Sequence, residues 1–266
     1  MTDQPRPHFN EIVARRYSRR QALKGLGSSA AAVALMSTAG GAVSAARAAG
    51  AGTKTSLTFQ EIAHRYDTTH HVAPGYRADI LIRWGDPVIP GAPAFKPSRQ
   101  TPEAQKMQFG YNNDFAAYLP LPLGSNRSDH GLLFVNHEYT TTPLMLPGYE
   151  DFRRAIQTIS ENDAGVEMEA HGVSIIEIKQ DGNEWRVVED SQLARRISVT
   201  TPMELTGPAA GHDRLKTSED PTGTKVIGTL NNCSGGKTPW GTVLTAEENW
   251  HNYFAGERNT LRAKHK

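Results

Sequence analysis

Sulfhydryl groups are almost absent from the sequence, because Cys233 is the one cysteine among 266 residues. A single thiol excludes an intrachain disulfide. An excess of charge of one sign is also missing, since 29 basic residues stand against 28 acidic ones and the formal net charge is +1. This balance gives no reason to expect nucleic acid or an anionic membrane as the main partner.

A long hydrophobic run is missing as well. The mildly apolar segment from about Gly25 to Val43 is rich in Ala and Gly, and it is too short and too weakly hydrophobic for a stable membrane span. It follows Arg19 and Arg20 of a twin-arginine pattern, and small residues suited to signal peptidase precede position 49. The alternative is a surface amphipathic helix, but the apolar residues form no one-sided stripe.

We therefore predict that residues 1–48 are a twin-arginine signal peptide, read by the export machinery as an address and not as an anchor. The predicted location is periplasmic or secreted. Because this route exports proteins already folded, often with a metal or cofactor loaded, the leader favours a cofactor-bearing protein. Residues 49–266 are left to form the mature domain.

Turn-forming residues are plentiful in that domain, with 24 glycines and 16 prolines in the whole chain, which favours short strands over long helices. Apolar segments separated by turns predict an all-β architecture with few short helices: a sandwich, a barrel or a propeller. The predicted strands are Ala78–Trp84, His130–Asn136, Gly172–Lys179, Glu184–Glu189, Lys225–Leu230 and Thr238–Thr245. Helix is predicted over Tyr149–Ser160 and in a turn at Glu247–Phe254, and Thr200–Pro208 is predicted to be a loop.

Carboxylates follow two of the predicted strands. Glu138 lies in the segment NHEYT, and Glu247 and Glu248 lie in TAEENW. A strand end is a rigid place from which to present polar groups, and a Glu there can bind a hard cation through oxygen. Each segment can equally be an ordinary polar turn that satisfies its own backbone.

Cys233 is flanked by amides, Ser and Gly, whereas a structural cysteine usually has apolar neighbours. Three roles remain open from the residues alone: a metal ligand, a nucleophile, or an inert side chain. A thiolate among carboxylates suits iron better than calcium, which prefers oxygen alone. No pattern typical of a zinc site is present in the sequence.

The segment NHEYT at 136–140, the long segment at 207–254 and the twin-arginine leader together resemble PhoX-type alkaline phosphatases. The resemblance extends over about residues 55–254. It implies a β-propeller and a cofactor of Fe³⁺ and Ca²⁺ ions that hydrolyses phosphate monoesters outside the cytoplasm.

The resemblance also implies roles for individual residues. Cys233 would ligate iron, Glu138 would be a carboxylate ligand of the cluster, and at least one of Glu247 and Glu248 would bind metal. His212 is a weaker candidate for contact with the substrate phosphate. The catalytic residues themselves are not identified by the sequence. The expected partners are small-molecule phosphate esters, and the expected state is a monomer.

Family members are longer than this chain, and the sequence after Gly256 no longer resembles them. We therefore expect residues 49–266 to be the N-terminal part of a PhoX-like propeller domain, with little phosphatase activity when expressed alone; robust p-nitrophenyl phosphate turnover would refute this. The alternatives are a noncatalytic calcium-binding propeller module and an inactive truncated product. Iron together with calcium in the purified protein favours the phosphatase, and calcium alone favours the binding module.

Overall fold

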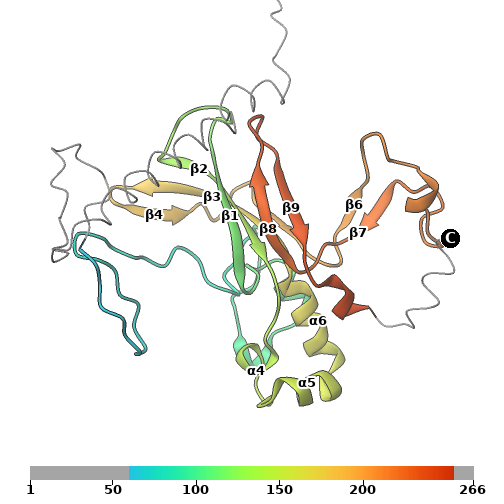
Figure 1. The fold of residues 1–266 in the computed structure, drawn as a ribbon, viewed down its shortest axis with the longest axis horizontal. Coiled ribbons are helices and arrows are strands. Elements are labelled where there is room, and N and C mark those ends of the chain that lie inside the picture. Colours follow the sequence, from blue (N-terminus) through green and yellow to red (C-terminus); the bar gives the residue numbers. More distant parts are fainter. Residues whose placement is uncertain (1–59, 255–266) are drawn as a thin grey trace, which may run out of the picture. The chain divides into compact units, whose positions relative to one another are not determined.

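The computed structural model describes residues 60–254, and the regular elements in this range lie in a compact unit that begins at Tyr66. The predicted signal peptide at 1–48 lies outside the described residues. Strands outnumber helices in the described range, and most of the helices are short (Figure 1). Among residues 60–254, no helix is both long and apolar enough to cross a membrane.

An antiparallel sheet forms the centre of this unit. Its strand order is β1-β2-β3-β4, and β5 pairs with β3 on the same side as β4. The strands are β1 (Asn113–Pro120), β2 (His130–His137), β3 (Gly172–Asp181), β4 (Glu184–Val187) and β5 (Arg195–Ile197). β4 pairs with the end of β3 and β5 with its start, so the fourth position of the sheet is shared by two short strands.

Strand β2 is apolar in a continuous run because both faces of the sheet are covered. Val135 belongs to one core cluster with Phe109 and Ile176, whereas its neighbour Phe134 belongs to another cluster with Leu119 on the opposite side. Successive side chains of a strand point to opposite faces. The burial of both faces therefore explains the sequence LLFV, which would alternate with polar residues if one face met water.

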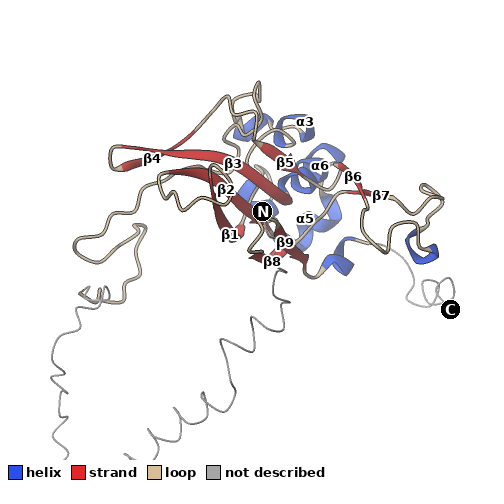
Figure 2. Cartoon of the chain, turned by 90° about the horizontal axis from the view of Figure 1, so that it is seen from above, coloured by secondary structure: helices blue, strands red, loops and turns tan. Residues whose placement is uncertain are grey.

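Two hairpins and several short helices complete the unit. The hairpins are β6 (Pro202–Glu204) with β7 (Lys225–Ile227), and β8 (Asn232–Lys237) with β9 (Val243–Glu247). The helices are α3 (Pro102–Gln105), α4 (Thr142–Met145), α5 (Phe152–Thr158) and α6 (Glu161–Ala170), with 3-10 turns η1 (Pro97–Arg99), η2 (Asp213–Leu215) and η3 (Trp250–Tyr253). Helices α3, α5 and α6 gather on one side of the sheet (Figure 2).

Arg196 links β5 to α6 and to the segment that follows α3 through hydrogen bonds. Its buried guanidinium donates hydrogen bonds to the backbone carbonyls of Gln108, Glu169, His171, Val173 and Ile197. Burial lowers the pKa of Arg196 to about 9, and the Glu169 charge opposes that shift. The guanidinium therefore stays protonated at neutral pH and keeps all of its donors.

The predictions for β2, β3, β4 and β7 are confirmed, apart from their ends. The strand predicted at Ala78–Trp84 is wrong: this segment forms no strand, because its backbone pairs with no neighbouring strand in the described range, although Leu81 and Ile82 pack on a core cluster. The loop predicted at Thr200–Pro208 contains β6. Strand β1 and helix α6 were not predicted from the sequence.

Two predicted boundaries also change. The strand predicted at Thr238–Thr245 begins only at Val243, because Thr238 and Thr242 close the β8–β9 turn through backbone and side-chain hydrogen bonds. The predicted helix Tyr149–Ser160 contains α5 but stops before Ser160, whose hydroxyl accepts from the Asp163 N–H and starts α6.

Candidate metal centre

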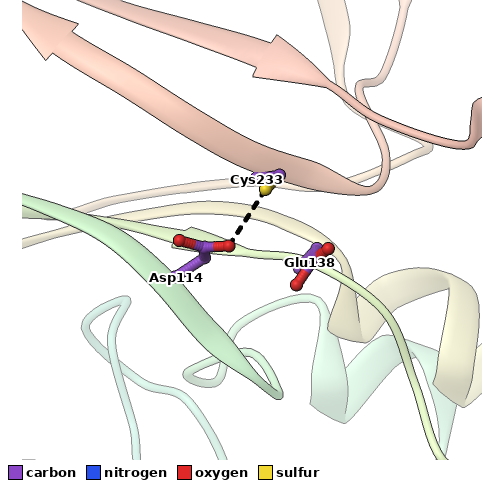
Figure 3. A group of neighbouring side chains, drawn as sticks. All are labelled: Asp114, Glu138 and Cys233. Carbon is purple, nitrogen blue, oxygen red and sulfur yellow. Dashed lines mark hydrogen bonds between the residues drawn. The ribbon is translucent and has the colours of Figure 1, made fainter.

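Three polar side chains meet where three strands come together. Asp114 lies on β1, Glu138 directly follows β2, and Cys233 lies on β8. Their ligand atoms all lie within 4.8 Å of one another, and the Cys233 thiol donates a hydrogen bond of 3.1 Å to Asp114 Oδ2 (Figure 3). Two carboxylates and a thiol at this spacing form a candidate metal centre.

Asp114 and Cys233 both occupy irregular positions of their ladders. Between Asn113 and Ala116 the pairing of β1 with β2 advances three residues on β1 for two on β2. Between Asn232 and Gly235 the pairing of β8 with β9 shows the same offset. Each strand therefore contains a β-bulge, which bends the strand and redirects a side chain out of the regular alternation.

Asn136 ties the bulge of β8 to the central sheet. Its fully buried amide group donates to the carbonyls of Cys233 at 2.8 Å and Ser234 at 3.2 Å, and its Oδ1 accepts from the Thr245 hydroxyl at 2.9 Å. At a bulge these carbonyls leave the β8–β9 ladder, so a side chain must satisfy them. Asn136 therefore fixes the backbone that presents the thiol.

Gly235 allows β8 to lie close against β1. A Cβ atom at this position would come within 2.4 Å of the Phe115 ring and 2.8 Å of the Leu244 carbonyl oxygen. Lys237 adds a hydrogen bond of 2.9 Å from its Nζ to the Tyr118 carbonyl. The close approach of these strands brings Cys233 to Asp114.

The backbone of Glu138 is held on both sides. Its N–H donates to the Asn112 carbonyl at 3.0 Å, and its carbonyl accepts from Nδ1 of His171. Burial lowers the pKa of His171 to about 4, so the imidazole is neutral at pH 7 and acts as a donor through this nitrogen. The Glu138 carboxylate thus projects from a fixed backbone.

Left-handed backbone conformations also gather at the centre. Among the described residues, the non-glycine residues with positive φ are Asn112, Asn231 and Asn249, with φ between 51° and 52°. Each lies within two residues of Asp114, Cys233 or Glu248 in sequence. Asn tolerates this conformation better than most residues, and unusual backbone geometry often accompanies functional sites.

The electrostatics of the cluster favour a bound cation. Hydrogen bonds to Asp114 and Glu248 are the main causes that raise the pKa of the Cys233 thiol to about 12. Burial raises the pKa of Glu138, and the charges of Asp114 and Glu248 add to that shift. A multivalent cation would reverse this mutual repulsion and stabilise the thiolate, so the donor set fits a metal ion.

The two adjacent glutamates predicted as ligands turn in different directions. Glu248 interacts with the Cys233 thiol and therefore borders the cluster. Glu247 Oε1 instead accepts from the Thr229 hydroxyl and the Leu230 N–H, both at 2.9 Å. In this structure Glu247 supports the loop that leads into β8.

His212 lies in the connection between β6 and β7 and is exposed. Its Nδ1 accepts a hydrogen bond of 3.1 Å from the Arg214 N–H at the start of η2. The structure does not place it in the Asp114–Glu138–Cys233 cluster. Its contact with a substrate phosphate stays a prediction, as do the ligand roles of the other residues.

Asp114 was missed by sequence reasoning. Asn113 and Asp114 begin β1 and its apolar residues come after them, whereas Glu138 follows the end of β2 and Glu247 ends β9. Because neighbouring antiparallel strands run in opposite directions, the start of β1 lies beside the end of β2. The available signal was therefore the polar triplet at residues 112–114, at the start of the strand that pairs with the strand ending at His137.

The fold and the site together define a strand-rich protein with a carboxylate–thiol cluster that forms a candidate metal centre. A family model described as alkaline phosphatase PhoX matches residues 57–266, and the chain belongs to this family. The resemblance inferred from the sequence is thus confirmed, but the expectation that it ends near residue 254 is wrong, because the match continues to residue 266. No curated protein gives a significant match.

One similar solved structure is Pseudomonas fluorescens PhoX in complex with vanadate, a transition state analogue. It is 37% identical to this chain, with a TM-score of 0.65. The match covers 75% of this chain but 33% of the Pseudomonas chain, so this chain spans about a third of that relative.

Proposed function

We propose that this chain contributes to an extracytoplasmic phosphatase that hydrolyses phosphate monoesters at an iron–calcium centre. The observation that carries the proposal is the meeting of Asp114, Glu138 and Cys233 in a member of the PhoX family. The vanadate bound to the Pseudomonas relative, a transition state analogue, supports phosphate esters as the substrates.

The residues present fit both kinds of ion. Carboxylate oxygens suit Ca²⁺, whereas a thiolate beside them suits iron. We assign Cys233 to iron and Asp114, Glu138 and Glu248 to the cluster as a whole. When bound, such cations stabilise the negative charge that gathers on a transferring phosphoryl group and lower the pKa of bound water.

The protein's own contribution is to hold these ligands in place and partly neutralise the ions. Asn136 fixes the backbone of Cys233, and His171 fixes that of Glu138. The anionic ligands would repel a phosphate dianion if no cation were bound. Ligand preorganisation and charge balance are therefore the tasks of this part of the chain. His212 is proposed to contact the phosphate.

The fold supports assignment to a propeller. A four-position antiparallel sheet with consecutive strands adjacent is the arrangement of a propeller blade. We propose that β1–β5 form such a blade and that β6–β9 belong to further ones. The twin-arginine leader at 1–48 supports export to the periplasm or beyond.

Metal analysis of the exported protein tests the proposal. We expect iron together with calcium, and we expect Cys233→Ser to lose the iron while the protein stays folded. Calcium without iron in the unmodified protein would instead favour a noncatalytic calcium-binding module. An optical band from thiolate-to-iron charge transfer that disappears in Cys233→Ser would identify the ligand directly.

The adjacent glutamates provide a matched pair of variants. We expect Glu248→Gln to lower the metal content, because Glu248 borders the cluster. Glu247→Gln should mainly weaken the loop at Thr229 and Leu230. Equal metal loss in both variants would show that Glu247 also reaches an ion when metal is bound.

A further inference from the structure

A cavity of about 670 Å³ lies directly beside the candidate metal centre. Glu138 belongs to both, because it lines the cavity and is a member of the cluster. The other walls come from α5, α6 and the turn η3, which lie near one another in Figure 1. This volume falls in the range of sites for small organic molecules.

The walls of the cavity are largely apolar and aromatic. Phe152 and Ile156 of α5 and Met168 of α6 line it, and Tyr139 and Tyr253 add aromatic rings. These five side chains are substantially exposed, at 42% to 64% of their surface. A site of this kind favours the organic part of a ligand over a phosphate group, which needs cations or many donors.

The charges of the cavity are negative. Its charged lining residues in the described range are Glu138 and Glu167, and no Lys or Arg is among them. His171, which also lines it, is neutral at pH 7 because burial lowers its pKa to about 4. Both carboxylates, after burial, contribute to a rise in the pKa of Tyr253 to about 12.

Glu167 has an unsatisfied oxygen. Its Oε2 accepts from the Thr140 hydroxyl at 3.0 Å, whereas its buried Oε1 has no hydrogen-bond partner among the described residues. A buried carboxylate oxygen without a donor is unfavourable. The positive charge of a ligand in the cavity would offset the cost of this buried carboxylate charge, and the neighbouring aromatic rings would favour the same charge.

We propose that this cavity binds an ammonium-bearing alcohol, as the leaving group of a phosphate monoester whose phosphate lies at the metal centre. The role as a leaving-group site rests on the proposed phosphatase function. The cavity selects for a positive charge on the alcohol, and it disfavours alcohols that carry a carboxylate. Glu167 is the residue that distinguishes the cation from a neutral group.

Choline and its neutral isostere 3,3-dimethylbutan-1-ol provide the test, because they differ in charge but hardly in shape. Binding of each free alcohol to the purified chain is measured by NMR titration or calorimetry. We expect choline to bind about tenfold more tightly, a difference of about 1.4 kcal/mol. Glu167→Gln should abolish this preference, leaving the binding of the isostere unchanged.

Glu161→Gln is the matched control, since it removes the same charge from the exposed start of the same helix. It should leave the preference for choline intact. Equal affinity for the two alcohols, no binding of either, or an equal effect of the two variants would overturn the inference.

The test is independent of metal content and phosphatase activity. Choline binding in a chain that proves free of iron would contradict the proposed function and leave the cavity assignment standing. Absence of choline binding in an iron-loaded phosphatase would contradict the cavity assignment alone.

Discussion

Replacing Asn136 by alanine tests how the candidate metal centre is held together. The amide makes three side-chain hydrogen bonds, to the carbonyls of Cys233 and Ser234 and from the hydroxyl of Thr245, and it is fully buried. A net contribution of about 1 kcal/mol for each bond gives a loss of about 3 kcal/mol in the free energy of unfolding. The two carbonyls would lose the donor that satisfies them at the bulge.

Urea unfolding followed by circular dichroism measures the loss of stability, and metal analysis measures the consequence for the site. We expect Asn136→Ala to lower the iron content, because the backbone that presents the Cys233 thiol is no longer fixed. Asn183→Ala, in the exposed β3–β4 turn, is the control and should change the free energy of unfolding by less than about 0.5 kcal/mol.

Two results together would show that Asn136 does not fix the bulge of β8. One is a loss in Asn136→Ala no larger than that of the control. The other is an unchanged iron content. Such an outcome would mean that water replaces the amide at the two carbonyls, and that the position of the thiol is set by the metal and not by the fold.

Three further predictions concern the support of the site and of the surrounding fold. Gly235→Ala places a methyl group against the Phe115 ring, so we expect overpacking to lower the free energy of unfolding in urea by about 2 kcal/mol and to reduce the bound iron. An unchanged free energy of unfolding and iron content would contradict the close approach of β8 and β1. Arg196→Lys cannot reach five carbonyls and should lower the free energy of unfolding by about 3 kcal/mol, whereas an effect below about 1 kcal/mol would show that the guanidinium is dispensable. Hydrogen bonding, above all from the Thr222 hydroxyl, lowers the pKa of Asp220 from 3.8 to about 2. The ionised Asp220 carboxylate therefore stabilises its loop above pH 4, and this stabilisation is lost as the pH falls towards 2. Amide hydrogen exchange in the loop should show the loss in the native chain but not in Asp220→Asn.

The regular part of the fold could be predicted from the sequence because it follows from residue patterns. The apolar run before Asn136 predicted β2, and Asp181-Gly182 predicted the β3–β4 hairpin, since both signals are local. The segment Ala78–Trp84 has a similar apolar pattern but forms no strand. Pairing depends on a neighbouring strand with free backbone groups, and such a neighbour is not visible in a local pattern.

The site was predictable only in part. Cys233 and Glu138 were singled out by residue type and by the resemblance, but Asp114 was not, because the strand that bears it was not predicted. Glu247 and Glu248 looked equivalent in sequence. Their separation depends on the point at which β9 ends, so that Glu247 turns to Leu230 and Glu248 borders the thiol.

The irregularities that sequence reasoning missed are the features that assemble the site. In a regular ladder, residues alternate between faces, and shifting the register by one residue moves a side chain to the opposite face. One extra residue in β1 and one in β8 provide that local shift at Asp114 and Cys233, while the rest of each strand keeps its apolar residues in the core. A bulge needs support for the carbonyls it releases, and in β8 that support is the side chain of Asn136. The geometry of the candidate metal centre is therefore determined by two inserted residues and the amide that stabilises one of them, which explains why it depends on contacts between segments about 100 residues apart.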